Sequence, residues 1–445
     1  MSFSQLGLSD ALLTALAEQG YHTPSAVQTQ AIPAVLAGRD VMVAAHTGTG
    51  KTAGFSLPVL QLLSHGAAPQ AKQCRALIIT PTRELAAQVA KQIEQYGRYL
   101  DLRFSAVFGG VRIEPQIAQL QAGVDVLVAT PGRLLDLYQQ QAIDFSQLEI
   151  LVLDEADHML DLGFIDDIAR IQALLPDTRQ TLLFSATFSA PIKALATNML
   201  KQALVLDVNP LNSTVNQVTQ RVYRVDKSRK TALLIELLTS QPWEQVLVFT
   251  ASKHGADKLV SQLDKVGIVA ATIHANRTQH ARTQVLEGFR NAQIKVLIAT
   301  DIASRGIDIQ QLPCVINLDL PFVAQDYVHR IGRTGRNGHG GLAVSLVSED
   351  ELKTLQAIEQ LIGRKLEQQW LAGFTPLPNA PLQNAAPKQQ SGQKKAKSAK
   401  RDDDDDEYGN FEADPPRSRG AKHHGRAGRV SKITTTQRPS TKRRP

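Results

Sequence analysis

The sequence predicts an α/β protein with two tandem, doubly wound parallel-sheet domains and a disordered, mostly basic C-terminal tail. Short apolar runs alternate with longer helical patterns, this alternation occurs twice along the 445 residues, and the composition changes abruptly near residue 375. Runs that are apolar at almost every position suit the strands of a parallel sheet, because helices cover both faces of such a sheet.

The two sets of apolar runs define the expected domains. The first set covers residues 40–44, 76–80, 124–129, 150–153 and 180–185, and the second covers residues 245–249, 269–273, 296–299, 314–317 and 342–346. Segments between the runs, such as residues 82–96, place apolar residues at helical spacing. A polar, irregular stretch separates the two sets. We therefore expect a first domain at residues 1–207, a linker at 208–217 and a second domain at 218–374.

The tail at residues 375–445 differs from the rest of the chain in its charge. It contains sixteen Lys and Arg and eight Asp and Glu, so it carries +8, whereas the whole chain carries +7. A segment with few aromatic residues and many charges buries too little apolar surface to offset chain entropy. We expect it to be disordered and to bind nucleic acid non-specifically, with a solubilising extension as the alternative. The role of the acidic run Asp402–Asp406 stays open.

The composition excludes several classes of protein. Cys74 and Cys314 are the two cysteines, and their separation fits neither a metal site nor a disulfide framework. The first residues lack the basic segment and apolar run of a secretory signal, and no apolar stretch approaches membrane-spanning length. We expect a soluble, cytoplasmic protein with two reduced thiols.

Residues 45–52 have the pattern of a phosphate-binding loop between a strand and a helix. Glycines let backbone N–H groups surround phosphate oxygens, a lysine reaches the β- and γ-phosphates, and a hydroxyl reaches Mg²⁺. The general pattern begins with glycine, whereas this loop begins with alanine, and a plain turn with an exposed lysine is the alternative. The loop consists of Ala45, His46, Thr47, Gly48, Thr49, Gly50, Lys51 and Thr52, and Thr52 is an expected metal ligand.

A second part of the same site follows the apolar run at 150–153. The run ends in Asp154 and Glu155, at the edge where open α/β sheets bind ligands. Asp154 can hold Mg²⁺ directly or through water, and Glu155 can orient and deprotonate an attacking water, as phosphoryl transfer requires. Taken alone, an acidic loop at a strand end is common. Together with Lys51, these carboxylates predict a Mg²⁺-dependent nucleotide hydrolase.

The segment Asp154-Glu155-Ala156-Asp157 resembles the tetrapeptide that names the DEAD-box ATP-dependent RNA helicases, and alanine at the first loop position is that family's usual form. The resemblance extends over residues 3–372 and is greatest to the bacterial RhlE-type branch. It implies two RecA-like domains, ATP and Mg²⁺ as cofactors, and RNA contacted through its backbone with little sequence preference. The implied activity is RNA-dependent ATP hydrolysis. Closure of the two domains would couple it to local unwinding of short duplexes or to remodelling of RNA–protein complexes.

The resemblance also implies roles for further residues of the nucleotide site. Tyr21 and Gln28 match the adenine-recognition segment, because a tyrosine ring can stack on adenine and an amide offers it a donor and an acceptor. Asp308 matches the residue that meets the ribose. Arg333 and Arg336 match arginines that point at the γ-phosphate and stabilise its charge during transfer. The residues implied in coupling ATP to RNA are Asp157, Ser185, Thr187 and His329.

The remaining matches are to loops that contact RNA in the family. Each loop follows an apolar run, and any one of them alone could be a plain turn. Glycines allow close approach of an RNA backbone, and Thr and Arg side chains bind its phosphates. The matching residues are Pro81, Arg83, Gly109, Gly110, Thr130, Gly132 and Arg133 in the first domain and Gln279, Arg282 and Thr300 in the second.

Two other functions remain as alternatives at this point. A translocating DNA helicase is disfavoured by the adenine segment and by Asp157. Whether RNA or DNA stimulates the ATPase activity of this protein would distinguish the two functions. A non-enzymatic, ATP-gated RNA clamp or assembly scaffold is disfavoured by the intact Lys51, Glu155 and Arg333. Ribosome assembly and RNA turnover, with ribosomal precursors or RNA-decay proteins as partners, are processes that the RhlE-type branch implies.

Overall fold

The computed structural model describes residues 1–45, 48–208, 218–274, 276–301, 309, 312–335 and 340–376. These residues lie within one compact unit, Met1–Ala380. Most of the expected linker and the tail from residue 377 lie outside the described residues. The expected domain boundaries therefore stay a prediction.

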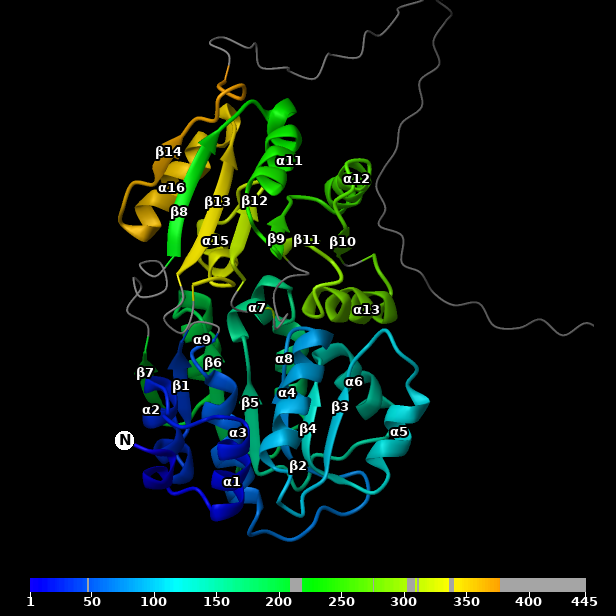
Figure 1. Cartoon of the computed structure of the whole chain (residues 1–445). Coiled ribbons are helices and arrows are strands. Elements are labelled where there is room, and N and C mark those ends of the chain that lie inside the picture. Colours follow the sequence, from blue (N-terminus) through cyan, green and yellow to red (C-terminus); the bar gives the residue numbers. More distant parts are fainter. Residues whose placement is uncertain are drawn as a thin grey trace, which may run out of the picture. The chain divides into compact units, whose positions relative to one another are not determined.

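The first part of the chain forms a seven-stranded, wholly parallel sheet, in the order β3-β4-β2-β5-β6-β1-β7 (Figure 1). Its strands are β1 (Val41–Ala44), β2 (Cys74–Ile79), β3 (Phe104–Val107), β4 (Val124–Ala129), β5 (Ile150–Leu153), β6 (Gln180–Ser185) and β7 (Leu204–Asp207). The expected strands are thus present, with bounds that differ by at most two residues. The sequence missed β3 and β7, the two edge strands, because their side chains alternate between buried and more exposed positions.

Helices cover both faces of this sheet because successive strand residues point to opposite sides. Val152 packs into the core on one face and Leu153 into the core on the other. The first face is covered by η1 (Phe3–Leu6), α1 (Asp10–Glu18), α2 (Ala26–Leu36), α3 (Lys51–Leu63) and α4 (Arg83–Tyr96). The second is covered by α5 (Glu114–Leu120), α6 (Pro131–Gln139), α7 (Ala156–Asp161), α8 (Ile165–Gln172) and α9 (Ala190–Met199).

The second part of the chain repeats this topology. Its parallel sheet has the order β10-β11-β9-β12-β13-β8-β14, which is the same permutation as in the first sheet (Figure 1). The strands are β8 (Val218–Arg224), β9 (Val246–Phe249), β10 (Ala270–Ile273), β11 (Val296–Ala299), β12 (Cys314–Asn317), β13 (Gly341–Val347) and β14 (Glu367–Gln369). The predicted fold class, two tandem doubly wound sheets, is confirmed, and the duplication is evident in strand order.

Helices also cover both faces of the second sheet. One face packs against α11 (Lys230–Ser240), which follows η2 (Lys227–Arg229), and α12 (Lys253–Asp264). The other packs against α13 (Gln279–Arg290), α15 (Ala324–Ile331) and α16 (Leu352–Ile362), with η3 (Glu349–Glu351) before α16. No helix of the described residues is long and apolar enough to cross a membrane. Burial raises the pKa of both cysteine thiols, which are free.

A buried arginine forms ion pairs at the N-terminal ends of strands in the first sheet. This edge of the sheet lies opposite the nucleotide loops. The Arg75 side chain is 5% exposed, donates to Asp125 (3.0 Å) and Glu149 (2.7 Å), and also donates to the Leu63 carbonyl. Asp125 is itself buried, and Arg75 is its ion-pair partner. Breaking one side of a buried ion pair costs more than removing the whole pair, because the remaining charge stays desolvated.

We expect Arg75→Met to lower the free energy of unfolding by about 3 kcal/mol, because it leaves Asp125 charged and buried. The matched control is Arg98→Met. Arg98 forms an ion pair with Glu18 in which both side chains are about half exposed, so its loss should cost under about 1 kcal/mol. Urea denaturation followed by circular dichroism measures both changes. Equal stabilities of the two variants would contradict the conclusion that Arg75 offsets the buried charge of Asp125.

Candidate nucleotide and nucleic-acid site

The strand order of the first sheet brings the predicted loops to one edge. All strands are parallel, so the loops that follow them lie at the same edge of the sheet. Strands β5, β6 and β1 are neighbours, and they precede the carboxylate loop, the Ser185 loop and the phosphate loop. Strands β3, β4 and β2 are also neighbours, and they precede the loops matched to RNA binding. The edge is thereby divided into a nucleotide half and an RNA half.

The phosphate loop has the backbone shape that its glycines allow. Gly48 and Gly50 have φ of 85° and 86°, in the left-handed region that favours glycine, and Gly50 caps the N-terminus of α3. A Cβ atom at Gly50 would lie 2.4 Å from the Gln28 amide nitrogen, so a larger residue there would displace the Gln28 side chain. His46 and Thr47 lie outside the described residues. Thr49 and Thr52 are partly exposed beside the loop.

Lys51, the first residue of α3, has a buried ammonium group without a hydrogen-bond partner among the described residues. The residue is 6% exposed, and its charge lowers the pKa values of the Asp154 and Glu155 carboxyls. A buried ammonium group that lacks hydrogen bonds is costly unless a ligand supplies acceptors. A helix N-terminus adds a positive electrostatic potential at the same place. This end of α3 therefore has the donors and charge that bind a phosphate chain.

Two adjacent carboxyl groups after β5 have pKa values shifted in opposite directions. Burial raises the pKa of Asp154 to about 7, although the Lys51 charge lowers it. Burial also acts to raise the pKa of Glu155, but the hydrogen bond from His158 and the charges of Lys51 and Arg333 outweigh it, so the pKa is lowered to about 2. Glu155 is therefore ionised at neutral pH, whereas Asp154 is partly protonated there.

The backbone at Glu155 is strained in a way that the sequence did not reveal. Its φ and ψ are 53° and 52°, in the left-handed region, which costs a non-glycine residue roughly 1–3 kcal/mol. This conformation makes Glu155 the N-cap of α7, and the His158 ring nitrogen lies 3.4 Å from its carboxylate. The strained turn and His158 together hold the Glu155 carboxylate in the pocket.

Asp157 connects this loop to the loop that follows β6. Its carboxylate accepts the Ala186 N–H at 3.1 Å and the Thr187 hydroxyl at 3.4 Å. The Ser185 hydroxyl is fully buried and accepts the Thr187 N–H. The structure thus brings together three of the four residues matched to coupling.

The fourth coupling residue, His329, lies with Arg333 in the same pocket as the nucleotide residues. The pocket is lined by Lys51, Glu155, Asp157, His158, Asp161, Ala186, His329 and Arg333. The first six come from the start of α3, from α7 and from loops of the first sheet, whereas His329 is on α15 and Arg333 follows it. The sequence analysis missed His158 and Asp161, although His158 stands one helical turn after Glu155. Asp308 and Arg336 lie outside the described residues.

The side chains expected to bind adenine have protein partners in this structure. The Gln28 amide accepts the Ser25 N–H at 2.8 Å and donates to the Gly50 carbonyl at 3.2 Å. Its second N–H and second lone pair stay available. The Tyr21 ring packs edge-on against Tyr96, with ring centroids 6.0 Å apart. Gln28 therefore lies against the phosphate loop itself, and adenine binding by this pair stays a prediction.

Most of the residues matched to RNA binding line a single groove. The groove is lined by Pro81, Thr82, Arg83, Glu84, Gly109, Thr130, Gly132, Arg133, Asp136, Leu162, Phe164 and Arg282. Seven of these were predicted from the sequence, whereas Leu162 and Phe164, which follow α7, were missed. Gly110 has φ of 78°, and the Arg83 guanidinium occupies the space where a side chain at this position would begin. Glycine there allows the arginine to lie across the loop.

Gln279 and Arg282 begin α13 and both contact Glu84 on α4. The Gln279 amide donates to the Glu84 carboxylate at 2.9 Å, and the Arg282 guanidinium lies 3.0 Å from it. Thr300 follows β11 and is partly exposed. Gln279 and Thr300 do not line the groove described above, and Gln279 lines a second groove with residues of α4 and α13.

Known proteins resemble this chain along most of its folded length. A family model for DEAD/DEAH box helicases matches residues 25–195, and a helicase conserved C-terminal domain model matches residues 229–338. The DEAD-box ATP-dependent RNA helicase RhpA of Helicobacter pylori is 40% identical over 366 residues, 82% of this chain and 73% of RhpA. The ATP-dependent RNA helicase RhlB of Pseudomonas syringae is 40% identical over 370 residues, 82% of this chain and 93% of RhlB.

A solved structure shows the same architecture. S. cerevisiae Dbp5 bound to RNA and ADP BeF3 is 31% identical, with a TM-score of 0.76, over 83% of this chain and 95% of that one. Tandem RecA-like sheets, a phosphate loop and strand-end carboxylates define a nucleoside-triphosphate-dependent motor. The chain belongs to the DEAD/DEAH box helicase family. It is an ATP-dependent RNA helicase.

We expect Asp154→Asn to stabilise the nucleotide-free protein at pH 8 by on the order of 2–4 kcal/mol. Burial raises the pKa of Asp154 from 3.8 to about 7, so between these values only the unfolded state releases its proton. The free energy of unfolding should therefore fall as pH rises through this window. Asparagine removes that dependence.

Urea denaturation without Mg²⁺ or nucleotide, at pH 4 and pH 8, measures this effect. Asp166→Asn, at an exposed position of α8, is the control and should change stability little at either pH. An Asp154→Asn protein no more stable than the parent at pH 8 would show that the carboxyl is not desolvated as described.

Proposed function

We propose that this helicase hydrolyses Mg²⁺-bound ATP in a site that both sheets complete, and that it thereby unwinds short RNA duplexes locally. The observation that carries the proposal is the pocket in which Lys51 and Glu155 meet His329 and Arg333. Because residues from both sheets line it, ATP binding favours the arrangement in which they are together. RNA residues also come from both sheets, so ATP and RNA bind cooperatively.

The residues of the pocket divide the chemistry of ATP hydrolysis. Lys51 binds the β- and γ-phosphates, and backbone N–H groups of the glycine-rich loop surround their oxygens. Glu155, held by His158 and ionised, orients the attacking water and accepts its proton. Arg333, which is 5% exposed, stabilises the negative charge that develops on the transferring phosphoryl group. Arg336 has the same proposed role.

Mg²⁺ fits this site by the chemistry of its donors. Asp154 provides a buried carboxylate and Thr52 a hydroxyl beside the phosphate loop, and oxygen ligands with substrate phosphates suit Mg²⁺. When bound, the ion neutralises charge on the phosphates. Because its pKa is raised, the Asp154 carboxyl would have to be deprotonated to hold the ion. Tyr21, Gln28 and Asp308 bind the adenosine moiety.

The groove along the loops after β2, β3 and β4 binds the RNA backbone. Arg83 and Arg133 supply positive charge, and Thr130 and the glycines allow hydrogen bonds and close approach. Arg282 approaches the same groove from α13. In this structure Glu84 holds both Arg282 and Gln279. Binding of a phosphate would therefore exchange one anionic partner of Arg282 for another.

The cellular role is less constrained than the reaction. The relatives reported above carry the names RhpA and RhlB, so placement in the RhlE-type branch stays a prediction. Ribosome assembly and RNA turnover stay predictions with it, as does a cytoplasmic location, which the bacterial relatives support. Sequencing of RNAs crosslinked to the protein in its own cells would test these assignments.

We expect Glu155→Gln to lower RNA-stimulated kcat by about 10²–10⁴-fold and to leave ATP binding close to that of the parent protein. The amide keeps the size of the side chain but cannot accept the water proton. Glu94→Gln, at an exposed position of α4, is the matched control and should keep full turnover. Steady-state phosphate release with single-stranded RNA, and with DNA in parallel, is the measurement. Full turnover by Glu155→Gln would overturn the base assignment, and equal stimulation by DNA would favour a DNA motor.

Deletion of residues 375–445 should weaken RNA binding more than it lowers kcat, because sixteen basic residues are removed while the pocket stays intact. The RNA affinity of the full chain should also fall more steeply with rising salt concentration than that of the deletion variant. Fluorescence anisotropy with a labelled RNA at two salt concentrations measures both effects. Unchanged RNA affinity at low salt would show that the tail does not bind RNA.

A further inference from the structure

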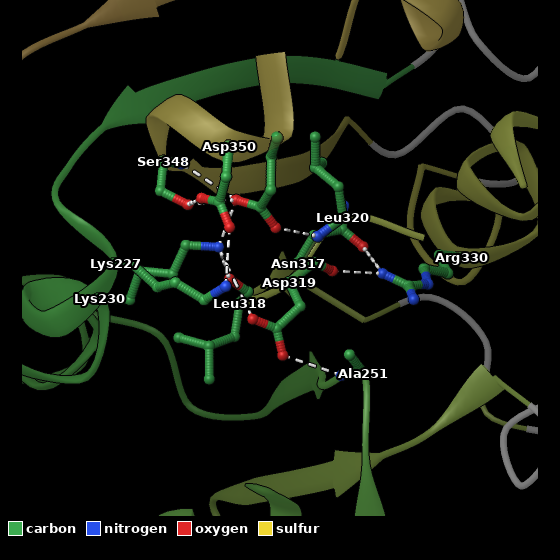
Figure 2. Close-up of polar contacts among 11 residues, drawn as sticks. Lys227, Lys230, Ala251, Asn317, Leu318, Asp319, Leu320, Arg330, Ser348 and Asp350 are labelled. Carbon is green, nitrogen blue, oxygen red and sulfur yellow. Dashed lines mark hydrogen bonds and ion pairs between the residues drawn. The ribbon is translucent and has the colours of Figure 1, made fainter. Parts of the chain in front are cut away.

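The second sheet contains a buried lysine that lies outside both the nucleotide pocket and the RNA groove. Lys230, the first residue of α11, has a side chain that is 5% exposed (Figure 2). Its ammonium group donates to the Leu318 carbonyl at 2.8 Å and to the Glu351 carboxylate, and it lies 3.6 Å from the Asp319 carboxylate. A lysine so deeply buried needs several partners to offset its desolvation.

The partners of Lys230 fix the backbone between β12 and α15. One Glu351 oxygen accepts the Leu320 N–H at 3.1 Å, while the other accepts the Ser348 N–H at 3.0 Å and the lysine (Figure 2). The Asp319 carboxylate accepts the Ala251 N–H at 2.9 Å. Lys230 and Glu351 therefore hold consecutive residues of this loop from two sides.

Arg330 connects the same loop to the functional residues of the second sheet. It donates to the Asp319 carbonyl at 2.7 Å and to the Asn317 side chain at 3.0 Å (Figure 2). It also forms a two-point ion pair with Asp301, at 2.5 and 2.7 Å, and its guanidinium lies 4.8 Å from the centre of the Phe249 ring. Asp301 is the residue after Thr300.

Arg330 lies between the residues of the second sheet that line the nucleotide pocket and the residue matched to RNA binding, Thr300. It is 2% exposed on α15, one turn before Arg333 and next to His329, both of which line the nucleotide pocket. Through Asp301 it also fixes the strand end that presents Thr300 for RNA binding. A shift of the β12–α15 loop would therefore move the nucleotide and RNA residues together.

We propose that the buried Lys230–Glu351 pair is a positioning device that locks the β12–α15 loop and thereby couples the nucleotide pocket to RNA affinity. Neither residue lines the nucleotide pocket or the RNA groove. The pair acts through Asp319 and Arg330 on Arg333 and Thr300. This inference rests on the proposed roles of Arg333 and Thr300. A buried ion pair gives little net stability compared with apolar packing, so selection of one defined arrangement is the function that suits it.

The test compares Glu351→Gln and Lys230→Met with Lys227→Met. Lys227 lies in the adjoining turn and forms an ion pair with Asp350 at 2.7 Å, but its side chain is 76% exposed, which makes it a matched control. The quantity measured is the ratio of RNA affinities with a non-hydrolysable ATP analogue and with ADP, in the full chain. We expect Glu351→Gln and Lys230→Met to reduce this ratio at least about tenfold, and Lys227→Met to leave it unchanged.

Thermal unfolding of each variant separates positioning from loss of folded protein. Glu351→Gln keeps an acceptor for the Leu320 N–H, so it stays informative even where Lys230→Met fails to fold. A folded Glu351→Gln protein with the parent's ratio, whatever its unfolding temperature, would overturn the inference. A parent protein whose RNA affinity does not depend on the nucleotide would instead contradict the proposed function.

Discussion

The structure depends on one topological constraint, which is that strands β5, β6 and β1 of a wholly parallel sheet are neighbours. Their C-terminal ends place Lys51, Asp154 and Ser185 at one edge, although these residues are far apart in sequence. The buried charges follow from that placement. Lys51 lowers the pKa of both carboxyls, while burial raises that of Asp154 to about 7. The resulting site holds a buried ammonium group with no hydrogen-bond partner among the described residues and a carboxyl whose pKa is raised, and we propose that both serve to bind Mg²⁺-bound nucleotide.

The second sheet has the same strand order, but the residues that it contributes to the nucleotide pocket are on α15 and directly after it. The loop contacted by Lys230 and Glu351 connects β12 to α15. His329 on α15 and Arg333 after it line a pocket whose other residues come from the first sheet. The sequence of α15 concentrates charge at its end, where Arg330 is buried against Asp301 and Phe249. In the function that we propose, one copy of the fold supplies phosphate binding and the other supplies positive charge to the transition state. This division explains why ATP and RNA should each favour the same arrangement.

Much of the fold could be predicted from sequence because buried parallel strands are short and mostly apolar. The missed strands β3, β7, β8 and β14 have exposed or polar positions, so their signal is weak. Motif residues at strand ends were placed at the correct edge for the same reason. The resemblance led us to expect hydrogen bonds between the Asp157 region and the hydroxyls after β6, and the contact of Thr187 with Asp157 agrees with it. The strain at Glu155 and the burial of Lys230 could not be predicted, because they depend on backbone angles or on segments that are distant in sequence.

The central claim is that the nucleotide pocket is unfinished without Arg333 from the second sheet. Turnover by Arg333→Ala, measured with saturating RNA and ATP beside its affinity for ADP, tests this claim most directly. The account predicts a fall in kcat of about 10³-fold or more, with ADP affinity close to that of the parent, since ADP has no γ-phosphate for the guanidinium to meet. Parent-like kcat in Arg333→Ala would contradict the account, because it would mean that the first sheet alone completes the site.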